Sequence, residues 1–378
     1  MKIGFDGAAA NTNYNLPFSD PESSDATMFV SGLCMLQVDI NDKIHWQNPS
    51  PGGTTFLKIL RIAFEKETAT SIKREYDRIV DEIPESLDMV FELDGSPILF
   101  KIKIVYQVTM CDGKALNAIA ENPATSRCHV CRKTAASFMN DRPVFARRIV
   151  GSRTMSMPTL HSYIRSLEFL LELAYKQPFC DIKKSDLKKS QDAMTRHKDF
   201  VKNEIRNKLG VTVDQVRPGY GNTNTGNVAK KCFMNPHTFA TCLGIDLELV
   251  QKMSNLLRMI SSMQPQAPSK FAEEAEKFYA LYKKKYAWKN LTPTIHKLIV
   301  HGAQIIEESI LPIGRLCEDP IETCIREIRE SRFRFARKHS RVNNLKDVFF
   351  FMNTKSDILV ANEKITKQTF EDLVSEVD

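Results

Sequence analysis

Alternating and helical patterns of apolar residues divide the chain into regions. Ile3 and Phe5 alternate with other residues, and the segment 27–38 is rich in β-branched and apolar residues, so both predict strands. From 54 to 83, apolar positions recur at helical spacing among charged residues, which predicts one long helix that ends before a proline. The first part of the chain is therefore expected to mix strands and helices.

A turn sequence separates two further β-rich runs, 87–93 and 98–108. Asp94-Gly95-Ser96 lies between them, and Asp-Gly between two such runs is a strong signal for a β-hairpin. From 157 to 289 the pattern becomes helical, apart from a Gly/Asn-rich interruption at 218–227. This order predicts an α/β protein in which a helical segment is inserted after a sheet.

Four regions follow from these patterns. Residues 1–121 are expected to form the first part of a sheet-containing core, and 122–290 are expected to form the helical insertion. Helical spacing returns within 291–345, which carries the last basic helix. Residues 346–378 are expected to be a peripheral tail.

Composition narrows the class of protein. Apolar residues make up 42% of the 378 positions and charged residues 26%, which excludes a disordered, collagen-like or low-complexity chain. No uncharged stretch approaches the roughly 18 apolar residues that cross a membrane, and the N-terminus lacks an apolar signal segment, so no membrane partner is expected. The nine cysteines are expected to be free thiols in a reducing compartment.

Positive charge gathers in three places. Lys and Arg number 53 against 46 Asp and Glu, a net charge of +7. The basic clusters lie at 181–208, 283–289 and 323–341. Any one of them is explained equally well by a solvated helix face, whereas three in one chain favour binding of nucleic-acid phosphates.

Two aspartates could form the first half of a catalytic metal site. Asp6 and Asp112 each come at the end of an apolar strand and precede a glycine, which exposes the carboxylate at the edge of a sheet. If the two strands are neighbours, the carboxylates converge, and such a pair binds Mg²⁺ or Mn²⁺ or shares a proton. Taken alone, each Asp-Gly is also explained by an ordinary turn.

A third acid for such a site is sought at the start of the last basic helix. Glu318, Asp319 and Glu322 stand there. Asp319 followed by Pro320 and Glu322 is also the pattern of an N-cap, a proline in the first turn and a capping-box glutamate. The local sequence by itself favours the cap.

A pair of cysteines and a pair of histidines have the spacing of zinc ligands. Cys128 and Cys131, in CHVC, suit two positions of a tetrahedral ion. His296 and His301, in HKLIVH, could supply the other two from a helix. Such a site would join two distant segments and stabilise the fold by on the order of 10 kcal/mol. Two buried free cysteines and two ordinary histidines are the alternative.

The order of these motifs resembles that of a known enzyme family. FDG, CDG, CHVC, a helical block, HKLIVHG and LPIGRLCEDPIE follow one another as in the catalytic core of Transib-type DNA transposases and the V(D)J recombinase catalytic subunit. The resemblance covers roughly residues 1–341, and the spacing of the zinc ligands is its most specific element. It implies an α/β fold: an RNase H-like mixed sheet with a large α-helical insertion and a Cys2His2 zinc site.

The resemblance also implies the roles of particular residues. The acids holding two Mg²⁺ or Mn²⁺ ions would be Asp6, Asp112 and Glu322, with His161 close to the active site. The zinc ligands would be Cys128, Cys131, His296 and His301. The DNA-contacting residues would be Asn227, Lys230 and Lys231, together with Arg326 and Arg329 of the basic helix.

A DDE-type recombinase core is the activity that this resemblance implies. It would nick double-stranded DNA at transposon ends, form hairpins and transfer strands, as a homodimer in the nucleus. Two departures bear on this expectation: the chain begins on the first catalytic strand without the family's N-terminal DNA-binding segments, and only Arg326 is kept from the motif that follows Glu322. The alternative is a transposon-derived DNA-binding or interaction protein that keeps the fold but lacks full activity. An unrelated RNase H-like nuclease is disfavoured by the zinc spacing.

Overall fold

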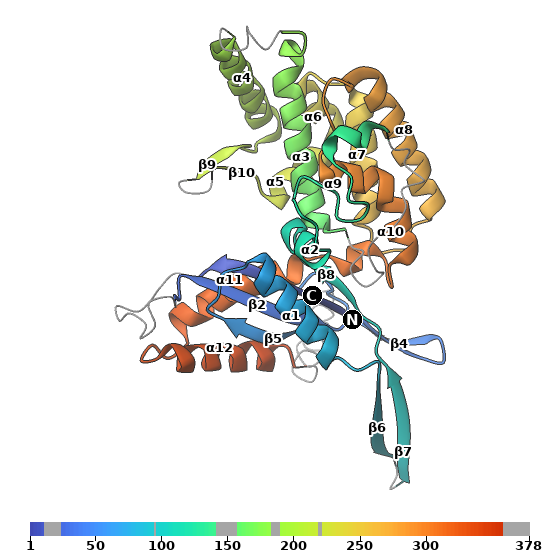
Figure 1. The fold of residues 1–378 in the computed structure, drawn as a ribbon, viewed down its shortest axis with the longest axis vertical. Coiled ribbons are helices and arrows are strands. Elements are labelled where there is room, and N and C mark those ends of the chain that lie inside the picture. The colour runs from blue at the N-terminus through green and yellow to red at the C-terminus, as the bar shows by residue number, and fades with distance from the viewer. Residues whose placement is uncertain (11–23, 94–95, 141–156, 183–189, 218–220, 358–378) are drawn as a thin grey trace, which may run out of the picture. The chain divides into compact units, whose positions relative to one another are not determined.

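The computed structural model describes residues 1–10, 24–93, 96–140, 157–182, 190–217 and 221–357. These residues fall into two compact units. Within the described ranges, the first unit takes in Met1–Glu121 and Arg315–Asp378, and the second takes in Asn122–Val150 and Met157–Gly314. The first unit carries a mixed sheet and the second is largely helical, so the fold is mixed α/β (Figure 1).

A four-stranded mixed sheet forms the centre of the first unit. Its order is β5-β2-β1-β8, with β1 and β8 parallel and the other neighbours antiparallel. The strands are β1 (Lys2–Ala9), β2 (Thr27–Cys34), β5 (Leu57–Ala63) and β8 (Gln107–Met110). β1 and β2 are therefore the two central strands, each paired on both sides.

The segment 54–83 is not the single helix that its spacing predicts. Leu57–Ala63 is strand β5, and helix α1 (Ala69–Glu82) begins only after Thr68, which caps it in a capping box. Pairing with β2 explains the difference, because it buries alternate residues such as Ile59. A short apolar run fits a strand or a helix equally well until its tertiary partner is known.

One face of the sheet packs against α1 and α2 (Gly113–Ile119). Ile3 and Phe5 of β1 join Ile72 of α1 and Leu116 of α2 in a buried hydrophobic core. Alternate residues of a strand point to opposite faces, so the even-numbered residues of β1 belong to the other face.

Helix α11 (Asp319–Arg334) covers that other face. Lys2 is fully buried there, and its ammonium group donates a hydrogen bond of 2.7 Å to the carbonyl oxygen of Cys317, just before the helix. A Cβ atom on Gly32 of β2 would lie 3.4 Å from the side chain of Ile321. The start of α11 is therefore tied to β1 and packed closely on β2.

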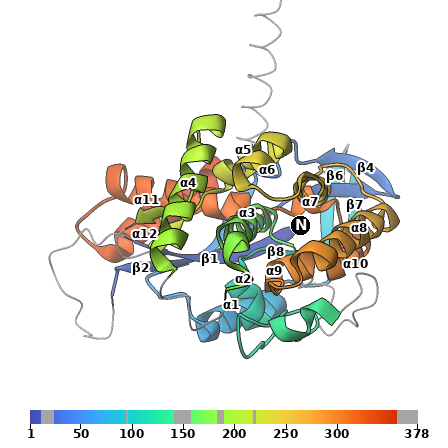
Figure 2. The same cartoon turned by 90° about the horizontal axis from the view of Figure 1, so that it is seen from above.

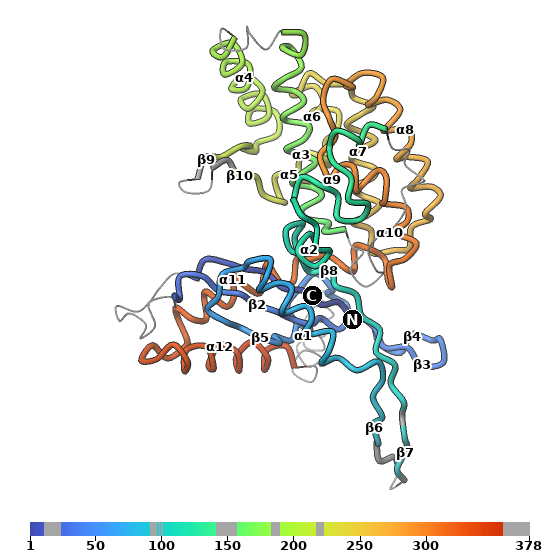
Figure 3. Tube along the Cα trace, in the orientation of Figure 1, coloured from blue at the N-terminus to red at the C-terminus, as the bar shows by residue number. Residues whose placement is uncertain are grey.

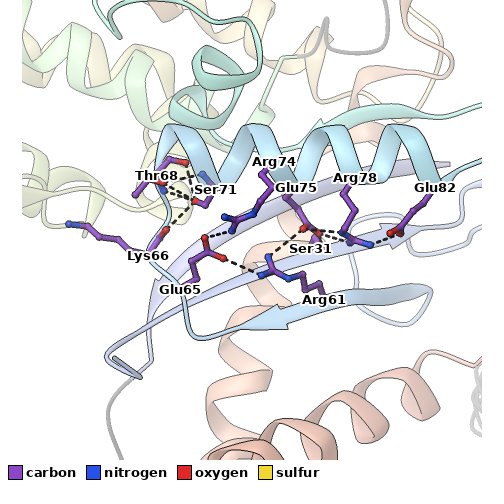
Figure 4. A network of polar contacts seen from close by, with 10 residues as sticks. All are labelled: Ser31, Arg61, Glu65, Lys66, Thr68, Ser71, Arg74, Glu75, Arg78 and Glu82. Atoms are coloured by element: carbon purple, nitrogen blue, oxygen red, sulfur yellow. Dashed lines mark hydrogen bonds and ion pairs between the residues drawn. The ribbon is translucent and has the colours of Figure 1, made fainter. Parts of the chain in front are cut away.

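A buried glutamate ties α1 to the sheet (Figure 4). The side chain of Glu75 is 1% exposed and accepts hydrogen bonds from Arg78 at 2.6 Å and from the Ser31 hydroxyl of β2 at 2.5 Å. Arg61 of β5 adds an ion pair at 3.4 Å. Burial raises the pKa of Glu75, but the hydrogen bonds from Arg78 and Ser31 outweigh it, and the net pKa lies below the ordinary value. The carboxylate is thus held charged inside the unit.

The C-terminal region is not the peripheral tail that the sequence predicts. Helix α12 (Arg341–Lys355) buries Val348 and Met352 and packs against β5. The side chain of Asn353 accepts from the Ile59 N–H at 2.8 Å and donates to the Ile59 carbonyl at 3.2 Å. The helix therefore satisfies backbone groups of an edge strand. Residues 358–378 of the expected tail lie outside the described residues.

Two hairpins belong to the first unit. β6 (Ser86–Leu93) and β7 (Ser96–Lys103) pair antiparallel, which confirms the predicted hairpin, although its turn residues 94–95 lie outside the described residues. β3 (Gln37–Ile40) and β4 (Lys43–Gln47) form the second hairpin. Figure 3 shows the β6–β7 ribbon extending beyond the four-stranded sheet.

The second unit is built around helix α3 (Thr159–Lys176). Figure 2 shows α3 among its neighbours, and it contacts α4, α5, α6, α7 and α9. The other helices are α4 (Gln191–Leu209), α5 (Gly226–Met234), α6 (Pro236–Leu243), α7 (Leu247–Ile260), α8 (Pro268–Tyr286), α9 (Pro293–His296) and α10 (Gly302–Glu308). Helices α9 and α10 pack inside this unit, although the sequence assigns them to the region 291–345.

Part of the predicted interruption at 218–227 is a short hairpin. β9 (Gln215–Arg217) pairs with β10 (Gly221–Thr223), and residues 218–220 lie outside the described residues. Across the ranges that the structure describes, no helix is both long enough and apolar enough to cross a membrane.

Candidate functional site

Asp6 and Asp112 lie at equivalent distances from the last residue pair of two neighbouring strands. The parallel pairing of β1 with β8 ends at Gly4 opposite Met110, and each aspartate lies two residues further along the chain, Asp6 within β1 and Asp112 just after β8. A Cβ atom on Gly4 would lie only 1.9 Å from the Met110 carbonyl oxygen, so glycine is what allows the two strands to approach there. The expected neighbouring strands are therefore present.

The sequence predicts that Asp6 ends its strand, but in the structure it lies within the strand. β1 continues to Ala9, and Asp6 is paired with Val30 of β2. The neighbouring strand β8 ends first, at Met110, so Asp6 lies where β1 has lost one partner. Its carboxylate accepts a hydrogen bond of 2.8 Å from the Gly7 N–H.

Asp112 is the N-cap of α2. Its carboxylate accepts a hydrogen bond of 2.7 Å from the Ala115 N–H. Asp112-Gly113 is therefore the start of a helix and not the ordinary turn that the local sequence also allows.

A third carboxylate, Glu67, lies nearby, although no motif in the sequence indicates that it belongs to a site. A Cβ atom on Gly7 would lie 2.3 Å from the Cβ of Glu67. Burial and the charge of Asp112 raise the pKa of Glu67, against the ion pair with Lys114 at 3.1 Å. Sequence reasoning missed Glu67 because it precedes α1 in a run of alternating charges that reads as an ordinary surface loop.

The same acids affect the pKa of buried Cys111. Burial raises the pKa of its thiol, and the charges of Asp112, Asp6 and Glu67 raise it further. Three carboxylates thus lie close enough to the end of β8 to act on this thiol. Such a concentration of charge is stabilised by a hard cation or by a shared proton.

Glu322 lies in the first turn of α11 and is not a capping-box residue. The N-cap is Glu318 rather than the predicted Asp319, and no side chain makes the capping hydrogen bond. Helix α11 contacts β1, β2 and β8, and Arg329 near its other end donates to the Ala9 carbonyl at 2.8 Å. The helix therefore runs along the strand that carries Asp6.

The three predicted catalytic acids come from neighbouring elements of the first unit. Among the described residues, one group of three or more His, Cys, Asp or Glu side chains brings its ligand atoms close enough to hold an ion, and it consists of Cys128, Cys131, His296 and His301. Strand β1 pairs with β8, and α11 contacts both strands.

The remaining predicted site residues lie on two helices of the second unit and on α11. His161 is half-buried on α3. Asn227, Lys230 and Lys231 are exposed on α5 at spacings that put them on one helix face. On α11, Arg326 is exposed, whereas Arg329 is partly buried and engaged with the sheet.

The Cys/His cluster is the best-formed site in the described residues. All four side chains are buried, and their ligand atoms lie within 4.8 Å of one another. Cys131 Sγ lies 3.3 Å from His296 Nε2. In a tetrahedral zinc site with ordinary bond lengths the ligand atoms lie about 3.3–3.8 Å apart, so small side-chain movements suffice to close the site.

A tight turn presents the two cysteines. Cys128 N–H donates to the Lys133 carbonyl at 3.0 Å, and Arg132 N–H donates to the Cys128 carbonyl at 2.7 Å. Arg132 has φ of 60°, a left-handed conformation that reverses the chain directly after Cys131. The turn brings both thiols to the same side.

The chemistry of the cluster fits a soft or borderline cation. A hydrogen bond from the Cys131 thiol lowers the pKa of Cys128 to about 7, which favours the thiolate that metals bind. Both ring nitrogens of His301 are buried without a hydrogen bond of ordinary geometry, which is costly unless a ligand satisfies them. A Cys2His2 set of this kind could hold a metal such as zinc.

One turn of π-helix brings the two histidines together. His296 ends α9, and η4 (Lys297–His301) is a π-helical turn. Positions five apart are about 140° apart around a regular α-helix, whereas the wider π turn returns them to one side. Phe138 stacks on His296 with ring centroids 3.9 Å apart and fixes its orientation.

Comparison with known proteins identifies no family for this chain. No model of a protein family matches the chain, and no curated protein matches it. The interpretation of both sites therefore depends on the residues themselves and on their positions.

Proposed function

We propose that the chain is the catalytic core of a DDE-type DNA transposase or recombinase with an RNase H-like fold. The observation that carries the proposal is the register of Asp6 and Asp112, two residues beyond the last pair of two parallel strands. Glu322 adds a third acid from α11, which packs on the same strands. The helical unit lies in the sequence between Asp112 and Glu322, as the resemblance implies.

In this proposal the chain binds DNA phosphodiesters and positions them against the acids. Two Mg²⁺ or Mn²⁺ ions, when bound, would activate a water molecule or a DNA 3′-hydroxyl and stabilise the leaving oxygen. Asp6 and Asp112 would hold them from the sheet and Glu322 from α11. Lys2 ties the start of α11 to β1, the strand that carries Asp6.

The Cys/His cluster has a structural role in this proposal. Cys128 and Cys131 come from the start of the helical unit and His296 and His301 from its end, so a zinc ion would close a long loop. The exposed residues of α5 and Arg326 would contact the DNA backbone, and His161 would act near the reacting strand. The active species would be a nuclear homodimer acting on double-stranded transposon ends.

A second function, DNA binding without cleavage, is favoured by one specific observation. The carboxylate of Asp112 already caps α2 by accepting a hydrogen bond from the Ala115 N–H. A transposon-derived protein that kept the fold and the basic helices could serve as a DNA-binding or interaction module.

Metal-dependent nicking of supercoiled plasmid tests the proposal. The purified chain would be compared with Glu322→Gln, which keeps the size of the side chain and removes its charge, in Mn²⁺. Glu330→Gln is the matched control, because Glu330 is an exposed acid of the same helix. Folding and zinc content would be measured for all three.

The expected result is nicking by the wild type and by Glu330→Gln but not by Glu322→Gln. Equal nicking by all three would remove Glu322 from the active site. No nicking by any of them, combined with salt-dependent binding of duplex DNA, would favour the second function.

A further inference from the structure

Exposed phenylalanines gather on α11 and α12, away from the sheet. Phe350 is 73% exposed, Phe335 70%, Phe333 60% and Phe351 46%. The rings of Phe335 and Phe351 stack with centroids 6.3 Å apart, so an aromatic pair joins the end of α11 to the middle of α12, and exposed Phe333 and Phe350 flank this pair in the sequence. Exposed apolar groups gathered in this way are characteristic of a binding surface.

Helix α12 shows why this surface does not belong to the core. Its buried residues Asn344, Val348 and Met352 recur every four positions and face the unit. Val342 and Phe350 recur at the same spacing on an exposed face, with Lys346 between them. A solvated helix normally carries polar residues on such a face, so apolar side chains there need another explanation.

Positive charge surrounds the aromatic rings. The segment 333–346 contains five Lys or Arg and no Asp or Glu. Arg334 pairs with Glu330, Arg337 with Asp347 and Arg341 with Asp25, which neutralises part of this charge. Lys338 lies 5.2 Å from the ring of Phe333, and exposed Lys346 follows on α12.

Flat apolar rings interleaved with lysines fit one class of partner. Single-stranded nucleic acid offers unpaired bases that stack on aromatic side chains and a phosphate backbone that binds cations. Duplex DNA hides its bases, and an apolar protein partner would gain nothing from the surrounding positive charge. Charge and shape together therefore favour the single strand.

We propose that Phe333, Phe335, Phe350 and Phe351 form a platform on which unpaired bases of single-stranded DNA stack, while Lys338 and Lys346 bind its phosphates. The platform lies on α11 and α12, outside the group of acids. It does not depend on the proposed nicking activity, and a chain without that activity would still bind single strands here.

Fluorescence anisotropy with a labelled oligo(dT) 20-mer and a matched 20-base-pair duplex tests the proposal on the full chain. Phe350→Leu removes a flat ring and keeps an apolar, helix-compatible side chain. We expect it to weaken oligo(dT) binding about tenfold, because a stacked base contributes a comparable factor, and to change duplex binding by less than twofold. Met263→Leu is the control, since Met263 is an exposed apolar residue, 46% exposed, outside the three basic clusters and outside the platform.

Salt dependence separates stacking from charge. Phe350→Leu should leave the slope of log K against log salt unchanged, whereas Lys346→Gln should reduce it by about 0.7, the effect of one phosphate contact on a single strand. Lys43→Gln, at an exposed position of β4, is the control for charge and should leave the slope unchanged.

Three outcomes would overturn the proposal. The first is an unchanged oligo(dT) affinity in folded Phe350→Leu, and the second is an equal loss for duplex and single strand. The third is self-association of the wild type that Phe350→Leu abolishes without affecting oligo(dT), since the surface would then bind a second copy. Should Phe350→Leu fail to fold, the proposal is tested instead by the oligo(dT) affinity of Phe335→Leu and by the salt dependence of binding in Lys346→Gln.

Discussion

His296 and His301 lie five positions apart, yet their rings are in contact, with centroids 5.2 Å apart. The π-helical turn between them makes this possible, because a regular α-helix would turn them away from each other. Both rings face the thiols of Cys128 and Cys131. A strained turn at this position is explained when a bound metal stabilises it.

Cys128→Ser is expected to release the metal and to unfold part of the helical unit. The hydroxyl of serine is a poor ligand, and loss of a structural zinc ion removes up to about 10 kcal/mol of stabilisation. Metal content by mass spectrometry and helix content by circular dichroism measure the two effects. Cys242→Ser, a buried cysteine of the same unit outside the cluster, should keep the metal. Stoichiometric zinc in Cys128→Ser would show that the ligand set is wrong.

Gly302→Ala is expected to destabilise the helical unit by about 1–2 kcal/mol. The backbone of Gly302 is helical, so alanine by itself would be favoured there. A Cβ atom would however lie 2.3 Å from the buried ring of Phe271, and overpacking of this kind costs about 1–3 kcal/mol. Thermal unfolding measures the change.

Two further variants check this explanation. Gly113→Ala, where a Cβ atom meets nothing within 4 Å, should be neutral or slightly stabilising. Phe271→Leu should lessen the effect of Gly302→Ala when the two are combined, because the smaller side chain makes room. Equal effects of Gly302→Ala in both backgrounds would contradict a steric cause.

Side-chain chemistry at fixed spacing was enough to predict some of these features. CHVC and HKLIVH identify the four residues that the structure brings together, because metal ligands are recognisable by type. The Asp-Gly turn predicts the β6–β7 hairpin for a similar reason, since the turn is a local property. The π-helical turn carries no such local signal, because it depends on what surrounds the two histidines.

Features that depend on distant partners could not be predicted. β5 has the apolar spacing of a helix, and only its pairing with β2 makes it a strand. Glu67 joins Asp6 and Asp112 because α1 begins beside β1, which its own neighbours in the sequence do not indicate. Residues 346–357 were predicted to be peripheral because the sequence does not show that Asn353 hydrogen-bonds to Ile59, which is far away in the chain.

Glu75→Gln is expected to lower the free energy of unfolding at neutral pH by about 2–3 kcal/mol. The substitution leaves Arg61 and Arg78 without their buried carboxylate, although both are about a third exposed and water screens part of the loss. Denaturant unfolding measures the effect. Glu82→Gln, an exposed partner of Arg78, should change the free energy by less than about 1 kcal/mol.

The pH dependence of that difference has a definite sign. The pKa of Glu75 is lower in the folded protein than in the unfolded chain, so its stabilisation is complete above the ordinary value of 4.5 and is lost as pH falls through the folded pKa. The wild type and Glu75→Gln should therefore converge in stability as the pH falls below about 4.5. A constant difference down to acidic pH would exclude the charged network as the cause.

Glu67→Gln is expected to have the opposite effect. Burial and the charge of Asp112 raise the pKa of Glu67, so the folded protein resists its ionisation. The cost is present at neutral pH and disappears as pH falls through the folded pKa toward the ordinary value of 4.5. Glu67→Gln should thus be slightly more stable than the wild type at pH 7, by about 1 kcal/mol or less, and equal to it near pH 4.

Added Mg²⁺ tests whether the destabilisation caused by ionised Glu67 belongs to a metal-binding site. If the acids at the end of β8 bind the cation, Mg²⁺ should stabilise the wild type at pH 7 and reduce its difference from Glu67→Gln, because the ion offsets the repulsion between the carboxylates. Asp81→Asn, at an exposed acid of α1, should respond to Mg²⁺ as the wild type does. Thermal unfolding with and without the ion measures all three. The same stability change in Glu67→Gln as in the wild type would mean that the carboxylates repel one another without holding a metal.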